Sequence, residues 1–278
     1  MSTQATQTGY HHVEHVMGMA VTIDVRDVHV DRSRGRPGLA DVLDWLRHVD
    51  ETFSPYLHDS PISRLGRGEI TLDDVGDEVC DVLVLCDQLT DATGGTFDAF
   101  AVPAPNGTML DPSGVVKGWS VERAAAILES HGLAHFVINA GGDIAVRGRP
   151  SPQELWSVGI RHPDRADSFA AVLQVEGPLA VATSATYERG AHIVDPRTGQ
   201  PTTDLASVTI TGPDLTFADA YATAVFVMGV EGLEWLLDNP GYEGMAITHD
   251  DQLFSTPGFA ALRRGADVRV DAAAPHTG

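Results

Sequence analysis

Two residues one helical turn apart have the chemistry of metal ligands. In FADAYATAVF (217–226), Asp219 and Thr223 stand at positions i and i+4, so both side chains lie on one face of a predicted helix. Two oxygen donors at this spacing, with a carbonyl from a loop, form half of a shell for Mg²⁺, which keeps waters and phosphates as its other ligands. A charge at the start of a helix and a packed threonine give the same pattern. The spacing alone leaves both interpretations open.

A histidine and a lysine offer a proton acceptor and a positive charge. His192 stands in GAHIVDPRTG, and the ordinary pKa of imidazole suits proton transfer near neutrality. Lys117 is the only lysine of the chain and follows the loop LDPSG, where the start of a helix could hold an anion. A structural histidine before a turn and a solvated lysine near a helix cap account for the same positions.

These residues fall between or at the ends of the predicted elements, which must position them. Amphipathic periodicity predicts helices over 39–53, 75–93, 119–131, 217–229 and 232–237. Short β-branched runs predict strands over 17–25, 136–140, 144–148, 156–160, 170–175, 179–183, 207–211, 244–249 and 252–255. Helices come first, strands dominate the middle and helices return near the end. This order predicts an α+β fold, one compact domain with mixed or antiparallel sheets flanked by helices.

The composition excludes several classes of protein. The 278 residues include 18 Lys and Arg against 39 Asp and Glu, a formal net charge of −21, and such a surface repels nucleic acid. No apolar run is long enough to cross a bilayer, and the first residues lack the pattern of a signal peptide or lipobox. Cys80 and Cys86 lie on different faces of a predicted helix and suit neither a disulfide nor a shared metal. We expect a cytoplasmic protein that binds no nucleic acid and does not insert into membranes.

A series of short motifs gives the most specific signal in the sequence. In chain order they are MGM-A, F-S-x-Y-x-x-x-S-x-x-S-x-L, G-G-T-F-D, LDPSGVVKGW, INAGGDI, W-x-V-x-I-x-x-P, A-T-S-x-x-Y, HIVDP-x-T-G-x-P, SVTI and A-D-A-x-A-T. The ordered set, from about Met17 to Met228, resembles the ApbE family of FAD:protein FMN transferases. The resemblance implies a single ApbE-like domain over 11–266. It also implies Mg²⁺ and FAD as a substrate, whose FMN half is transferred to a threonine hydroxyl of an acceptor flavoprotein with release of AMP. The ends of the chain are polar or rich in Ala and Pro without periodicity, which predicts a disordered tail at 1–10 and a flexible tail at 267–278.

The resemblance assigns a role to individual residues. Asp219 and Thr223 match the side-chain ligands of the metal, and Gly114 matches a loop residue that offers its carbonyl. His192 matches a histidine near the reacting phosphate, and we expect it to take the proton of the acceptor threonine while Asp195 orients it. The positions that match contacts to FAD are Met17, Tyr56, Thr96, Phe97, Asp98, Asp111, Lys117 and Val194.

Two departures and two alternative functions accompany this assignment. Met19 stands where the family usually has a threonine, and Ala222 stands where some members carry a second aspartate. Water in place of the threonine would make the protein an FAD hydrolase that forms FMN and AMP at the same site. A flavin-binding protein without catalysis is the other alternative, and the joint presence of His192, Asp219 and Thr223 argues against it.

Overall fold

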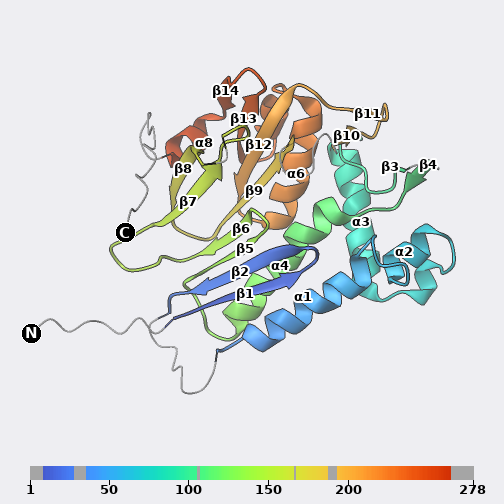
Figure 1. Ribbon diagram of the computed structural model, residues 1–278, viewed down its shortest axis with the longest axis horizontal. Helices are drawn as coiled ribbons and strands as arrows, with labels where there is room; N and C mark the ends of the chain where they lie inside the picture. The colour runs from blue at the N-terminus through green and yellow to red at the C-terminus, as the bar shows by residue number, and fades with distance from the viewer. Residues whose placement is uncertain (1–8, 28–35, 105–106, 166, 187–192, 264–278) are drawn as a thin grey trace, which may run out of the picture.

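The computed structural model describes residues 9–27, 36–104, 107–165, 167–186 and 193–263. Its centre is an antiparallel sheet of eight strands in the order β1-β2-β5-β6-β9-β12-β13-β14 (Figure 1). The bounds of these strands are Tyr10–Val16, Met19–Val25, Phe136–Ala140, Asp143–Arg147, Leu179–Ala185, Leu205–Gly212, Glu243–Thr248 and Leu253–Ser255. Segments far apart in the sequence therefore pair directly, as β2 does with β5 and β6 with β9.

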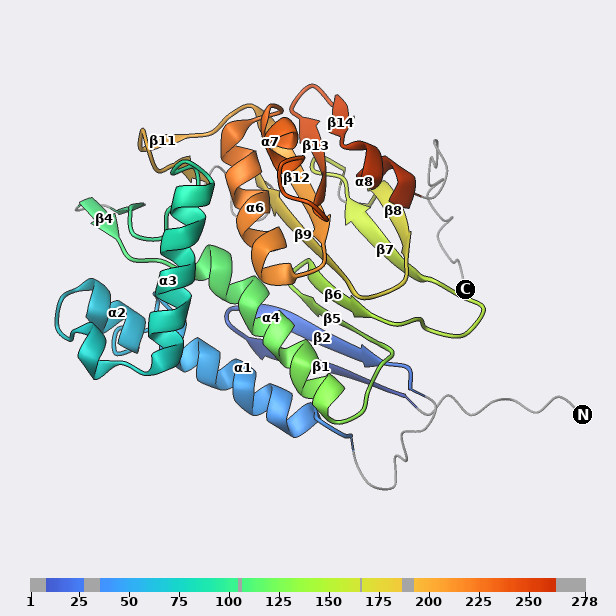
Figure 2. The same cartoon turned by 180° about the vertical axis from the view of Figure 1, so that it is seen from behind.

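Helices cover one face of this sheet (Figure 2). The bounds of the main helices are α1 Leu39–Phe53, α3 Asp77–Ala92, α4 Ser113–Ser130, α6 Leu215–Met228 and α7 Gly232–Leu236. Gly118 permits the close approach of α4 to α6, because a Cβ atom there would lie 2.3 Å from the carbonyl oxygen of Leu215. Within the described part of the chain, no helix is both long and apolar enough to cross a membrane.

A hairpin and a short helix cover the opposite face of the sheet (Figure 1). The bounds are β7 Trp156–Arg161, β8 Phe169–Val175 and α8 Pro257–Leu262. Burial alternates along β7, with every second residue exposed, as expected for a strand that presents one face to a core. Leu173 and Phe259 are fully buried in the second apolar core that forms between this layer and the sheet.

Short elements surround α3 (Figures 1 and 2). Two are hairpins, β3–β4 and β10–β11, and two are short helical segments, α2 and the 3-10 helix η2. Their bounds are β3 Val102–Ala104, β4 Gly107–Met109, β10 Val194–Asp195, β11 Gln200–Pro201, α2 Pro61–Gly66 and η2 Leu72–Asp74. Of these, α2, β10 and β11 come from parts of the sequence that carry the motifs.

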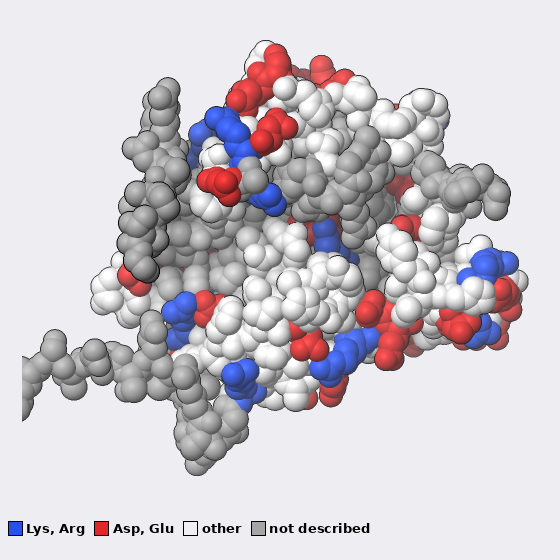
Figure 3. All heavy atoms as spheres, viewed as in Figure 1, with Lys and Arg blue, Asp and Glu red and all other residues white. Residues whose placement is uncertain are grey.

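Charges of both signs lie close together on the surface. On the face shown in Figure 3, basic and acidic side chains are neighbours around the rim, and uncharged side chains cover most of the centre. The ion pairs Arg26–Asp24, at 2.7 Å, and Arg47–Glu14, at 2.9 Å, are examples of this local pairing. Basic side chains are few in this protein, and many of those on the surface therefore have carboxylates as close neighbours.

The predicted α+β fold is confirmed, and the helix over 39–53 has the predicted bounds. Two boundaries were wrong. The N-terminal tail was expected to include residue 10, but Tyr10 is buried and begins β1, a strand that the sequence analysis missed. The helix expected from Trp119 begins at Ser113, and the Asp111 carboxylate accepts the Ser113 N–H at 3.0 Å just before it.

The structure describes both cysteines but only a small part of the predicted tails. Residues 1–8 of the expected N-terminal tail and all of the tail at 267–278 lie outside the described residues. Cys80 and Cys86 are both free thiols, and Cys86 is buried. Burial raises the pKa of the Cys86 thiol to about 12, so it behaves as a small apolar side chain.

Candidate active site

A cavity of about 650 Å³ lies where the motif-bearing segments meet. The described residues that line it include every predicted FAD contact: Met17, Tyr56, Thr96, Phe97, Asp98, Asp111, Lys117 and Val194. The three predicted metal ligands, Gly114, Asp219 and Thr223, line the same cavity. His192 lies outside the described residues, and Asp195 is adjacent to the lining residue Val194. The structure thus brings residues from positions 17 to 223 of the chain around one space.

The turn between β1 and β2 places Met17 in the wall of the cavity. Met17 and Gly18 form a two-residue hairpin loop, with φ angles of 54° and 69°, between the paired residues Val16 and Met19. A left-handed conformation at both positions is typical of a type I′ turn, and it is strained for a methionine. The Met17 N–H donates to Oδ2 of Asp50 on α1 at 3.2 Å. Asp50 therefore ties the strained turn to the helix layer.

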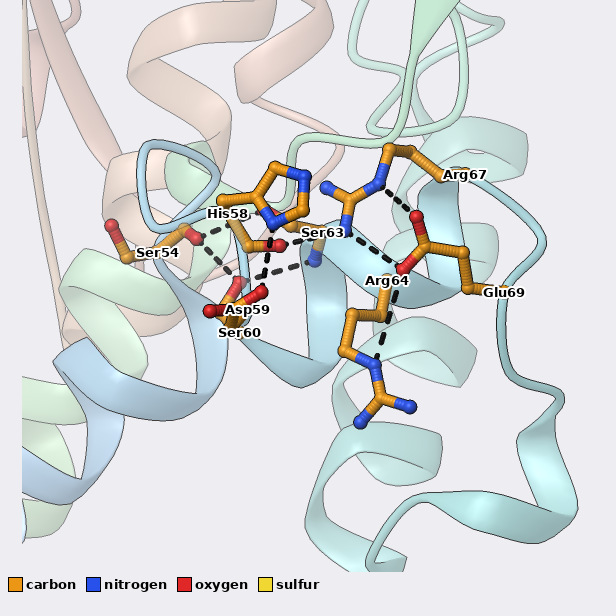
Figure 4. A network of polar contacts seen from close by, with 8 residues as sticks. All are labelled: Ser54, His58, Asp59, Ser60, Ser63, Arg64, Arg67 and Glu69. Carbon is orange, nitrogen blue, oxygen red and sulfur yellow. Dashed lines mark hydrogen bonds and ion pairs between the residues drawn. The ribbon is translucent and has the colours of Figure 1, made fainter.

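Serine side chains fix the loop that carries Tyr56 (Figure 4). The hydroxyls of Ser60 and Ser63 both donate to the carbonyl oxygen of Ser54, at 2.7 and 3.3 Å. Ser60 also caps α2, because its Oγ accepts the Ser63 N–H at 3.2 Å. The spacing in F-S-x-Y-x-x-x-S-x-x-S therefore closes a loop that presents Tyr56, 78% exposed, at the cavity.

An arginine closes the same loop from its other side (Figure 4). Arg67 donates through Nη2 to the carbonyl oxygen of His58 at 2.7 Å. Its guanidinium also binds Glu69, with Nε 2.7 Å from Oε1 and Nη2 2.9 Å from Oε2. This two-point contact fixes the direction of the guanidinium and with it the position of the His58 backbone.

The G-G-T-F-D motif supports the start of α4. The Phe97 N–H donates to the hydroxyl of Thr93 at 3.2 Å, and the Phe97 ring is buried. A Cβ atom at Gly114 would lie 3.0 Å from this ring, so the absence of a side chain lets α4 begin directly against Phe97. Gly114 was expected in a loop, but it belongs to the first turn of α4.

A buried charge cluster forms the inner wall. Asp143, at the start of β6, and Asp219, on α6, are 1% and 4% exposed. The ammonium of Lys117, on α4, lies 2.5 Å from Oδ2 of Asp143 and 3.6 Å from Oδ1 of Asp219. The other oxygen of Asp219, Oδ2, accepts the N–H of Gly118 at 3.0 Å. Three elements therefore meet through two carboxylates and one cation.

The two carboxylates exceed the charge that Lys117 supplies. Burial raises the pKa of Asp219 to about 8, Lys117 opposes the increase and Asp143 adds to it. The ionised form of Asp219 is therefore unfavourable in the protein alone. A bound cation would reverse this, because it would provide the charge that the cluster lacks.

The donor atoms around Asp219 fit a hard cation such as Mg²⁺. Thr223 lies one turn along α6, and its hydroxyl is 3.3 Å from that of Ser184 on β9. A carboxylate, a hydroxyl and the Gly114 carbonyl are the oxygen ligands that Mg²⁺ takes, with waters or phosphates completing the shell. The described residues contain no group of three or more His, Cys, Asp and Glu side chains that could hold a metal.

Asp195 has a partner other than the expected histidine. Its carboxylate accepts from Nε and Nη2 of Arg197, at 2.9 and 2.8 Å, and from the Arg197 backbone N–H at 2.9 Å. These hydrogen bonds hold the pKa of Asp195 below its usual range. Asp195 is therefore an ionised and fixed carboxylate, and its contact with His192 stays a prediction.

Two residues that organise the site were missed by the sequence analysis. Asp143 follows the Gly-Gly turn of INAGGDI, so a carboxylate at the end of a tight turn was the available signal. Asp50 occupies a position on α1 that nothing in the helical period distinguishes. Their partners, Lys117 and Met17, are distant in the sequence.

Comparison with known proteins places this geometry in a family. The model of the ApbE family matches residues 17–106 and 101–246. The FAD:protein FMN transferase of Treponema pallidum is 33% identical over 184 residues, 60% of this chain and 51% of that protein. That of Klebsiella pneumoniae is 29% identical over 157 residues, 53% of this chain and 45% of that protein. The chain spans about half the length of these curated relatives.

Solved structures share the fold. The flavin transferase ApbE from Vibrio cholerae superposes with a TM-score of 0.78 at 23% identity, covering 91% of this chain and 99% of that one. The ApbE protein from Thermotoga maritima gives a TM-score of 0.76 at 22% identity, covering 92% and 100%. The family model covers most of the chain and the fold agrees throughout, so this protein is a member of the ApbE family.

Proposed function

We propose that this protein is an FAD:protein FMN transferase that depends on Mg²⁺. It would transfer FMN from FAD to a threonine hydroxyl of an acceptor flavoprotein and release AMP. The observation that carries the proposal is the negative charge of the cavity wall around Asp219 and Thr223. Among the described residues that line the cavity, Asp50, Asp98, Asp111 and Asp219 are acidic and only Lys117 is basic. An anionic diphosphate is repelled by such a wall unless a cation accompanies it.

The shape and lining of the cavity suit a dinucleotide with an aromatic end. Its volume of about 650 Å³ is within the range of roughly 300–1,000 Å³ for small-molecule sites. Apolar and aromatic side chains such as Phe53, Tyr56 and Phe97 supply one part of the wall. Lys117, Asp219 and Thr223 supply a polar part. The flavin ring would contact the first part and the diphosphate the second.

The reaction exchanges a phosphoanhydride bond for a phosphate ester bond. The threonine oxygen forms a bond to the FMN phosphorus, the bond from this phosphorus to the bridging oxygen breaks, and AMP leaves with that oxygen. Mg²⁺, when bound at Asp219, Thr223 and Gly114, supplies positive charge for the diphosphate and the departing phosphate. Lys117 would donate a hydrogen bond to a phosphate oxygen from the inner wall.

The acceptor threonine needs a base, because a neutral hydroxyl is a poor nucleophile. His192 would take its proton on the imidazole, and the fixed carboxylate of Asp195 would orient the ring. The support for this pair is their place in HIVDP, the segment that leads into β10 beside the cavity. Holding the reacting groups in line provides most of the remaining acceleration.

Intact mass spectrometry tests the proposal directly. The purified protein is incubated with FAD, Mg²⁺ and an acceptor domain that carries a threonine flavinylation motif. The expected result is a mass gain equal to FMN on the acceptor, together with AMP, that disappears when Mg²⁺ is chelated or when His192 is replaced by Ala. Free FMN and AMP with an unmodified acceptor would show an FAD hydrolase instead. FAD that stays bound and unchanged would show a binding protein.

A further inference from the structure

We infer that Asp143 is a positioning residue that draws the Lys117 ammonium away from Asp219 and so leaves an Asp219 oxygen for a divalent cation. The inference rests on the proposed function, because it concerns the metal expected at Asp219. Asp143 belongs to none of the predicted ligand sets. Its carboxylate is nevertheless the closer of the two carboxylates to Lys117.

Asp143 is fixed by its backbone surroundings. It follows the turn Gly141–Gly142, whose φ angles of 60° and 107° suit glycine, and its own side chain is almost fully buried. Its Oδ1 accepts the backbone N–H of Thr183 on β9 at 3.1 Å. Thr183 is itself paired with Thr209 on β12. The carboxylate is therefore part of the sheet and cannot follow a moving partner.

Lys117 is the mobile member of the cluster. Its ammonium is carried on a flexible stem, and the Lys117 side chain is 25% exposed and lines the cavity. The ammonium nitrogen lies 2.5 Å from Oδ2 of Asp143, which is an ion-pair contact, whereas its distance of 3.6 Å to Oδ1 of Asp219 is beyond hydrogen-bond range. The ammonium is thus closer to Asp143, the carboxylate that belongs to none of the predicted ligand sets.

Asp219 has one oxygen committed and one facing Lys117. Oδ2 accepts the Gly118 N–H, and the close contact of α4 with α6 at Gly118 keeps this bond in place. A metal at Asp219 would use Oδ1. If Lys117 moved to Oδ1, its ammonium would neutralise the same oxygen and compete with the cation. Asp143 prevents this competition by offering Lys117 a stronger and immobile partner.

Removal of the Asp143 charge tests this role. Asp143→Asn keeps an oxygen that accepts the Thr183 N–H but no longer retains the ammonium. We expect the dissociation constant for Mn²⁺, a probe that takes the same oxygen ligands as Mg²⁺, to rise about 10- to 100-fold, as for other residues that act behind metal ligands. Binding is measured without FAD by isothermal titration calorimetry. Circular dichroism and thermal unfolding confirm that the variant is folded.

A double-variant cycle separates positioning from loss of charge. In a Lys117→Met background the competing ammonium is absent, so Asp143→Asn should weaken Mn²⁺ binding by less than about threefold. Asp50→Asn, which removes a cavity charge without touching Lys117, serves as the matched charge control and should have a similarly small effect. An equal loss from Asp143→Asn in both backgrounds would overturn the inference. Wild-type protein that binds no Mn²⁺, either without or with FAD, would refute the metal assignment of the proposed function as well.

The single lysine of the chain gives a second and independent measurement. Selective ¹³C and ¹⁵N labelling of lysine yields NMR signals from Lys117 alone. On titration of the wild type with Mg²⁺, we expect the ammonium to remain in its ion pair with Asp143. A shift of the Lys117 signals to those of a free lysine would show that Mg²⁺ displaces the ammonium, and would overturn the inference even if Asp143→Asn failed to fold.

Discussion

Both faces of the eight-stranded sheet carry an apolar core, but only the helical face also holds a buried charge cluster, and a single strand shows the contrast. Along β6, Asp143 and Ala145 face the helices, whereas Ile144 and Val146 face the β7–β8 hairpin. On the helical side the strand begins with a buried carboxylate that pairs with Lys117, a residue that lines the cavity. On the hairpin side it contributes only apolar groups to a closed core.

The difference separates two functions of a protein core, which are to hold charged groups for binding and to stabilise the fold by apolar packing. A buried charge destabilises the folded protein unless it is paired. The ionised form of Asp219 is destabilising in this way when no cation is bound. The apolar face has no such cost, since its side chains gain free energy by leaving water. We therefore expect substitutions in the hairpin core to change stability, and substitutions in the charge cluster of the helical face to change binding and catalysis.

The largest expected effect is on stability, at the hairpin face. Phe259→Ala removes a fully buried ring from the second core. Such truncations reduce the free energy of unfolding by about 3–5 kcal/mol. Chemical denaturation measures this loss, and the affinity for FAD should be unchanged at temperatures where the variant is folded. Phe169→Ala is the matched control, because the Phe169 side chain is half-exposed, and its loss should be much smaller.

The next effect is on catalysis, at the helical face. Asp219→Asn keeps an oxygen for the Gly118 N–H but removes the charged metal ligand. We expect the rate of FMN transfer to fall by about 10²- to 10³-fold, the size of effect of one lost electrostatic contact in a transition state. Because burial already disfavours the ionised form, the free energy of unfolding without metal should be equal to or greater than that of the wild type. A variant with wild-type transfer in Mg²⁺ would remove Asp219 from the metal site.

Most elements of the fold followed from the sequence, because their signals are local. The apolar spacing of 39–53 defines one face of a helix, and the β-branched runs at 136–140 and 207–211 define strands. β1 was missed because three of its seven residues are histidines on or near the solvent side, at positions 11, 12 and 15. The strand exists because its backbone pairs with β2 in full register.

The composition of the candidate site was largely predictable, but its internal connections were not. The motifs identified the residues that line the cavity, since the ordered set carries family information. The pairs Lys117–Asp143 and Met17–Asp50 join residues separated by 26 and 33 positions. Such contacts depend on how the sheet and helices pack, and no periodicity within one segment encodes them. His192 lies outside the described residues, so its role remains a prediction.

A substitution in the turn between β1 and β2 should have a smaller effect. It should change stability and the affinity for FAD in opposite directions. Met17→Gly relieves the strain of a left-handed methionine, and we expect the free energy of unfolding to rise by up to about 1 kcal/mol. The same change removes a side chain from the cavity wall, so the dissociation constant for FAD should increase several-fold. Denaturation and a titration of flavin fluorescence measure the two quantities. Gly18→Ala instead adds a side chain at the second left-handed position of the turn, and it should lower the free energy of unfolding. Tighter FAD binding by Met17→Gly would contradict this account.

The smallest expected effect concerns the loop that holds Tyr56 at the cavity. Ser60→Ala removes both the cap of α2 and the 2.7 Å bond to the Ser54 carbonyl, whereas Ser63→Ala removes only the weaker bond of 3.3 Å to the same carbonyl. Loss of a cap costs about 1 kcal/mol. We therefore expect Ser60→Ala to raise the KM for FAD several-fold with kcat nearly unchanged, and Ser63→Ala to have less effect on either.

The split between KM and kcat is the informative readout in that pair. A looser loop lowers the fraction of protein in which Tyr56 is placed for binding, but it leaves the groups around the diphosphate untouched, and a loss of initial binding appears in KM alone. If both variants instead lowered kcat together, the serines would act on the reacting groups. The loop would then belong to the chemistry of the helical face rather than to its binding surface.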